Sequence, residues 1–141
     1  MKDAVMDQRA KAFIPHVMVV TRGTTVSFPN NDVILHNVFA QFEAKKFDLG
    51  LYPQGATVRQ TFDKEGIVAI RCNIHSRMSA YLYVTSSPYH AVADKDGRFQ
   101  VSGVRPGTYR IRLWHESGNE FSGTVSVDAG PAAKDWILPN R

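Results

Sequence analysis

Short extended runs, each closed by turn residues, recur along this chain and constrain its fold more than any other feature. From Met78 to Val84 apolar residues occupy every second position, which is the period of a strand with one buried face. Comparable extended runs cover residues 13–20, 24–28, 33–39, 57–62 and 67–72. Clusters of Gly, Pro, Asn and Asp separate the runs, and helical periodicity is weak throughout. The pattern predicts an all-β fold, built as an antiparallel sandwich or barrel.

Local composition predicts three further details of the segment from residue 13 to residue 84. Pro15 interrupts the run 13–20 and has no amide hydrogen to donate, so that run is expected at a sheet edge. Segment 45–53 is expected to be a loop. Residues 63–66 (Asp-Lys-Glu-Gly) connect two extended runs and are expected to close a hairpin.

The composition changes at residues 85–88 (Thr-Ser-Ser-Pro), which predicts two domains, 1–87 and 88–141. The second is expected to contain a tight turn at 94–97. Short strands are expected there at residues 89–93, 99–101, 109–114, 125–127 and 136–138. Because so short a unit buries only a small core, we expect it to pack against the first domain.

Composition and charge exclude several classes of protein. An apolar fraction of 43% is too high for a disordered chain. The net charge of +4, from 17 basic and 13 acidic residues, is not gathered into a basic tract, so nucleic-acid binding is not expected. No apolar run approaches the roughly 20 residues that cross a bilayer. The single cysteine, Cys72, excludes an internal disulfide framework and any site built from cysteines alone.

That cysteine belongs to a compact motif, Cys72-x2-His75-x2-Met78, at the junction of two extended runs. A tight loop at that junction can turn a thiol, an imidazole and a thioether toward one point, and His36 lies on an earlier run. Two imidazoles, one thiolate and one weak thioether form the donor set of a mononuclear blue-copper site. Taken singly, each of these residues is also an ordinary core residue.

The order His, Cys, His, Met with this short loop resembles the cupredoxin family, in particular its plastocyanin-like and amicyanin-like members. Segments 23–28 and 66–72 resemble the family's strands that precede the ligands, and the resemblance covers residues 12–84. It implies a Greek-key cupredoxin β-sandwich holding one copper, as Cu(I) or Cu(II), per chain. His36, Cys72 and His75 would form the trigonal plane, and Met78 would take the axial position.

The resemblance also implies roles for neighbouring residues. The Asn37 side chain would tie the two ligand-bearing segments together, and the Asn73 backbone N–H would donate to the thiolate. His75 would expose its far ring edge for electron transfer, Ile74 would supply part of an apolar patch around it, and Arg77 would steer an acidic partner.

The function implied is electron transfer through a type 1 copper, without catalysis of any substrate reaction. The expected partner is an acidic redox protein, such as a cytochrome or a dehydrogenase. Copper carriers work outside the reducing cytoplasm, so we expect a periplasmic protein whose signal peptide has been removed. The partner's identity, the potential and the oligomeric state stay open.

Residues 88–141 resemble a second family, the transthyretin-like or carboxypeptidase-regulatory β-sandwich, through segments 96–99 and 104–109. The composite resembles bacterial plastocyanin-like proteins associated with methylamine utilisation.

Other functions stay open. A copper-storage or copper-resistance protein would bind the metal without shuttling electrons. A structural β-module would use Cys72 and the histidines for packing, and the donors also suit zinc. A second metal site could involve His16, His90 and His115. Cys72 and His75 are less suited to nucleophilic catalysis, because no glycine-rich oxyanion motif accompanies them.

Overall fold

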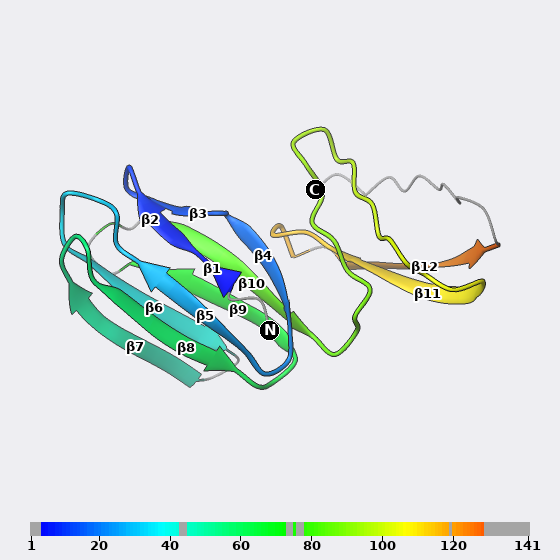
Figure 1. Ribbon diagram of the computed structural model, residues 1–141, viewed down its shortest axis with the longest axis horizontal. Helices are drawn as coiled ribbons and strands as arrows, with labels where there is room; N and C mark the ends of the chain where they lie inside the picture. Colours follow the sequence, from blue (N-terminus) through cyan, green and yellow to red (C-terminus); the bar gives the residue numbers. More distant parts are fainter. Residues whose placement is uncertain (1–3, 43–44, 73–74, 76–77, 119, 129–141) are drawn as a thin grey trace. The chain divides into compact units, whose positions relative to one another are not determined.

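The computed structural model describes residues 4–42, 45–72, 75, 78–118 and 120–128. Within these ranges the secondary structure is all β, with no helix, and so no helix in them could span a membrane. The chain divides into two compact units, the first ending at Phe99 and the second beginning at Gln100. The strands of each unit are labelled in Figure 1.

Two sheets and a small hairpin make up the first unit. The five-stranded sheet has the order β4-β10-β9-β6-β7, with bounds Val17–Thr21, Ser79–Thr85, Gly66–Arg71, His36–Phe42 and Lys45–Tyr52. The three-stranded sheet has the order β1-β5-β8, with bounds Ala4–Val5, Thr24–Pro29 and Thr57–Phe62. The hairpin pairs β2 with β3, with bounds Asp7–Arg9 and Ala12–Ile14.

The core takes one face from each sheet. Alternate residues of β5 and β10 are buried, because successive side chains of a strand point to opposite faces. Val26 and Phe28 from β5 and Leu82 from β10 are fully buried. The Phe28 ring also meets Phe62 of β8 edge-to-face, with centroids 6.4 Å apart. The predicted strands at 24–28, 57–62, 67–72 and 78–84 are confirmed, with ends shifted by a residue or so.

Several expectations for the first unit were wrong. Segment 45–53 is not a loop, because β7 runs through it and pairs with β6. Segment 63–66 closes no hairpin, since β8 pairs with β5 while β9 pairs with β10 and β6. It instead carries the chain from one sheet to the other. A short polar turn can close a hairpin or connect two sheets. Which of the two forms depends on pairing with strands that are distant in sequence.

Two further runs are shorter than predicted. The run 13–20 divides into β3 and β4 around Pro15, because proline donates no ladder hydrogen bond. β4 is nevertheless an edge strand, as expected, and it lies parallel to β10. The run 33–39 becomes a strand only at His36.

The second unit contains one described hairpin, β11 (Gly107–Trp114) with β12 (Glu120–Val127). Tyr109, Ile111 and Leu113 alternate with more exposed residues along β11, as predicted. The turn at 94–97 is confirmed by the Gly97 N–H, which donates to the Asp94 carbonyl. Segments 89–93 and 99–101 are not strands, and 136–138 lies outside the described residues. The domain division after residue 87, and the packing of one unit on the other, stay predictions.

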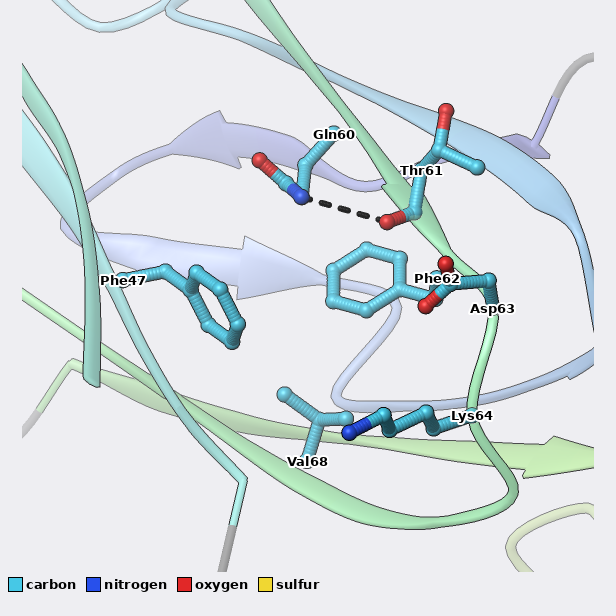
Figure 2. Close-up of a pocket in the computed structure, with 7 residues that line it drawn as sticks. All are labelled: Phe47, Gln60, Thr61, Phe62, Asp63, Lys64 and Val68. Carbon is cyan, nitrogen blue, oxygen red and sulfur yellow. Dashed lines mark hydrogen bonds between the residues drawn. The ribbon is translucent and has the colours of Figure 1, made fainter. Parts of the chain in front are cut away.

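A cavity of about 330 Å³ opens between the two sheets of the first unit. Phe47, Phe62 and Val68 form its apolar wall, and Lys64 lies at its edge (Figure 2). The cavity lies toward the start of β9, whereas Cys72 follows the end of that strand.

Candidate metal centre

Strand pairing brings the three predicted equatorial residues to one end of the five-stranded sheet. His36 is the first residue of β6, and Cys72 directly follows β9. The two strands are antiparallel neighbours, with Phe39 opposite Arg71. The start of β6 and the end of β9 therefore coincide, and His75 follows in the connection to β10.

The ligand-capable atoms of these residues converge. Cys72 Sγ lies 3.8 Å from His36 Nδ1 and 3.7 Å from His75 Nδ1. All three atoms lie within 4.8 Å of one another. The two imidazole rings have centroids 5.0 Å apart and an interplanar angle of 68°. Both histidines thus present the same ring nitrogen to the sulfur.

Backbone hydrogen bonds close the loop that carries the cysteine and the second histidine. The Met78 N–H donates to the His75 carbonyl at 2.9 Å, and the Cys72 N–H donates to the Met78 carbonyl at 3.3 Å. Met78 is 1% exposed and belongs to the core. Its role as an axial ligand stays a prediction.

Three polar atoms surround the sulfur of Cys72. Asn37 Oδ1 lies 3.5 Å from Cys72 Sγ, in addition to the two imidazole nitrogens. A thiol can donate its one hydrogen to only one of these atoms at a time, and its sulfur is a weak acceptor. The contact with Oδ1 joins the Asn37 side chain of β6 to Cys72, while its role in tying the ligand-bearing segments together stays a prediction. A cation bound by a thiolate would satisfy both imidazole nitrogens together.

The geometry fits one first-row metal ion. At bond lengths typical of such ions, about 2.3 Å to a thiolate and about 2.0 Å to an imidazole, trigonal angles separate sulfur from nitrogen by about 3.7 Å. The two Sγ–Nδ1 distances are 3.8 and 3.7 Å. Two imidazoles with one thiolate suit copper in both oxidation states, because thiolate favours Cu(I) and imidazole also suits Cu(II).

The two histidines differ in their access to solvent. His36 is 0% exposed, whereas His75 is only half-buried. The cluster therefore reaches the surface through His75. The segment before His36 also exposes apolar side chains, with Val33 82% and Leu35 49% exposed.

One residue of the site was missed by sequence reasoning. Asp32 Oδ2 lies 2.9 Å from His36 Nε2, on the ring edge away from Cys72. The contact with His36 and the Lys11 N–H hydrogen bond lower the pKa of this carboxyl. In the sequence, Asp32 lies in one of the clusters of turn residues that separate the extended runs. Its spacing of four residues before a candidate ligand was the one available signal.

A buried tyrosine supports the same strand end. Tyr52 lies opposite His36 in the β6–β7 register. Its hydroxyl donates to the Phe28 carbonyl at 2.6 Å and accepts from Gln8 Nε2 at 2.5 Å. Burial raises the pKa of Tyr52 to about 12.

Tyr52→Phe is therefore expected to lower the free energy of unfolding of the apo-protein by about 1–3 kcal/mol at pH 7, because buried polar groups lose a hydrogen-bond partner. In the parent protein the unfolded tyrosine ionises first, at its ordinary pKa. Stability should thus fall as the pH rises from about 10 toward about 12. Denaturant titrations at pH 7 and pH 11 test this. Tyr89→Phe, at an exposed position, is the control, and an alkaline slope unchanged in Tyr52→Phe would contradict the assignment.

The remaining predicted site residues are not part of the described cluster. Asn73, Ile74 and Arg77 lie outside the described residues, so their roles stay predictions. The other histidines, His16, His90 and His115, are exposed. Among the described side chains, the only group of three or more potential ligands is His36, Cys72 and His75.

Solved structures with similar folds include cupredoxins and a copper-containing nitrite reductase. A purple cupredoxin from Nitrosopumilus maritimus is 20% identical, with a TM-score of 0.54 over 58% of this chain and 99% of that chain. A reduced amicyanin variant is also 20% identical, with a TM-score of 0.54 over 57% of this chain and 80% of that chain. A copper-containing nitrite reductase from Thermus scotoductus is 25% identical, with a TM-score of 0.56 over 61% of this chain and 23% of that chain.

These likenesses confirm the predicted fold, an all-β cupredoxin sandwich. No curated protein matches the chain. Residues 64–134 match the model of a family described as polysaccharide lyase family 4, domain II. This segment runs from the connection before β9 into the second unit, and it includes Cys72 and His75 but not His36. Because the match covers just over half of the sequence, the chain belongs to the family described as polysaccharide lyase family 4, domain II.

Proposed function

We propose that this protein transfers electrons through one mononuclear type 1 copper per chain. The observation that carries the proposal is the convergence of His36 Nδ1, Cys72 Sγ and His75 Nδ1 within 4.8 Å at one end of a cupredoxin sandwich. Met78 is the proposed axial ligand. Copper would supply a one-electron couple, and the protein would supply a donor set acceptable to both oxidation states.

The chain's own residues suit that task. Pairing of β6 with β9 holds His36 close to Cys72, which directly follows β9, so the donors would need to move little on electron transfer. His75 is the proposed point of electron entry, because it is the more exposed imidazole. Exposed Val33 and Leu35 lie close by in sequence to His36 and would widen the apolar contact surface. Similar amicyanin structures are described in both reduced and oxidised states.

The finer assignments extend this proposal. We propose a plastocyanin-like or amicyanin-like carrier, not an enzyme, that works in a periplasm with an acidic redox protein as partner. Asn37 and Asn73 would order the ligand loop, while Ile74 and Arg77 would contribute to docking. Residues 88–141 are proposed to be a small transthyretin-like or carboxypeptidase-regulatory-like β unit. The family description names a domain of lyases, whereas the proposed function rests on the copper donor set.

A visible absorption titration of the apo-protein with Cu(II) tests the proposal. We expect a strong thiolate-to-copper charge-transfer band that saturates at one copper per chain, and rapid electron self-exchange between the Cu(I) and Cu(II) forms. Copper bound with the band but without measurable self-exchange would favour storage. A protein that takes up no copper would favour a structural β-module.

A further inference from the structure

The carboxylate of Asp32 contacts one edge of the His36 ring, and the opposite edge of the ring faces Cys72. His36 Nε2 lies 2.9 Å from Asp32 Oδ2, and His36 Nδ1 lies 3.8 Å from Cys72 Sγ. An imidazole that donates from Nε2 keeps a lone pair on Nδ1, since the neutral ring carries one hydrogen. The contact with Asp32 thus selects the tautomer that a metal at the cluster requires.

The carboxylate is itself held by backbone amides. Asp32 Oδ2 also accepts from the Lys11 N–H at 2.8 Å, and Oδ1 accepts from the Val33 N–H at 2.9 Å. Hydrogen bonds donated to a carboxylate stabilise its charged form. Asp32 is 9% exposed and His36 is 0% exposed, so the negative charge lies next to the ring in a poorly solvated environment.

A second set of hydrogen bonds fixes the backbone of Asp32. Its own N–H donates to Asn30 Oδ1 at 2.9 Å. The Asn30 amide group donates in turn to the carbonyls of Ile34 and Tyr52, both at 3.0 Å. Asn30 is fully buried. The segment before His36 is therefore anchored to the end of β7.

The Lys11 amide reaches Asp32 from a strained turn. Ala10 and Lys11 connect β2 to β3, and their φ angles are 53° and 59°. Residues other than glycine disfavour positive φ angles, but two-residue turns of this kind require a positive φ at both positions. The hairpin thus aims a backbone donor at a carboxylate distant in sequence.

We infer that Asp32 is a positioning residue for the metal centre, held by the β2–β3 hairpin, and that its charge stabilises Cu(II) relative to Cu(I). It fixes the orientation and tautomer of His36, and its negative charge favours the more positive oxidation state, so it lowers the reduction potential. The part that concerns copper rests on the proposed function.

Three variants separate orientation from charge. Asp32→Asn keeps an oxygen acceptor of the same shape but removes the charge, whereas Asp32→Ala removes both. Asp48→Asn is the matched control, since Asp48 is exposed on β7 and its carboxylate accepts from the Gly50 N–H at 2.9 Å. The apo-proteins are compared by ring ¹⁵N NMR of His36, and the copper forms by voltammetry and by chelator competition.

We expect His36 to carry its hydrogen on Nε2 in the parent, Asp32→Asn and Asp48→Asn apo-proteins, and to populate both tautomers in Asp32→Ala. Asp32→Asn should weaken Cu(II) binding about tenfold relative to Cu(I) binding. For a one-electron couple this corresponds to a potential raised by about 59 mV. Asp48→Asn should shift the potential much less.

The outcomes distinguish this inference from the proposed function. An unchanged tautomer in Asp32→Ala would overturn the positioning role, and the NMR reads this without any metal. Equal potentials in Asp32→Asn and Asp48→Asn would overturn the charge effect. A parent protein without the charge-transfer band would instead contradict the proposed function, and the apo NMR result would still decide whether Asp32 orients His36.

Discussion

Cys72→Ser is expected to abolish the thiolate-to-copper charge-transfer band completely. The band requires a thiolate bound to Cu(II), and Cys72 is the only cysteine of the chain. Serine keeps the shape of the side chain but supplies a hydroxyl, which is a far poorer ligand for Cu(I). The two Nδ1 atoms that now lie 3.8 and 3.7 Å from the sulfur would retain Cu(II) only weakly.

Absorption and EPR spectra recorded during Cu(II) titration measure this effect. His16→Ala is the control, since His16 is an exposed imidazole whose Nδ1 contacts the Ser79 carbonyl. It should keep the full band and the one-to-one stoichiometry. A band that survives in Cys72→Ser, or that disappears in His16→Ala, would place the copper elsewhere. Far-UV circular dichroism of both apo-variants establishes that the β fold is retained.

Phe28→Ala is expected to cause the largest loss of stability, about 3–5 kcal/mol in the free energy of unfolding. Phe28 is 0% exposed on β5 and packs edge-to-face on Phe62. Truncation removes buried apolar surface and leaves a cavity between two sheets that cannot easily close. The backbone carbonyl of Phe28 also accepts a hydrogen bond from the Tyr52 hydroxyl. A shift of β5 would therefore disturb the end of β7 that lies opposite His36.

Denaturant titration of the apo-protein measures this loss. Phe99→Ala serves as the control because the Phe99 side chain is 39% exposed, and its loss should be far smaller. The copper band of Phe28→Ala should survive at low denaturant, since Phe28 is not one of the proposed ligands. Equal losses in the two variants would contradict the assignment of Phe28 to the core.

Local sequence pattern predicted much of the first unit. Alternation at 78–84 gave the correct strand, because one face of β10 packs into the core and the other does not. Segment 45–53 was misread as a loop, since its charged and glycine residues have low strand propensity. Pairing with β6 overrides that propensity. The connection at 63–66 was misread because a turn contains no information about the sheet that its second strand joins.

The residues of the candidate site likewise include some that the sequence pattern indicated and one that only the structure revealed. Cys72 and His75 were recognisable because one short loop carries a thiol and an imidazole at close spacing, while the axial role of Met78 stays a prediction. His36 was recognisable only through its place on an earlier extended run, and the register of β6 with β9 explains why it meets the cysteine. Asp32 was missed, since an aspartate in a turn is ordinary and its contact with the histidine ring depends on side-chain direction.

By itself, the sequence determined the class of fold and singled out the candidate metal donors, because both follow from residue types at short, regular spacings. Only the tertiary structure decided which strands pair, which histidine is buried, and which group bonds its outer nitrogen. The Lys11 amide meets Asp32 across 21 positions of the chain, at 2.8 Å. Such contacts arise from long-range strand pairing and loop packing, whose energies are shared among many residues and are not written in any local pattern.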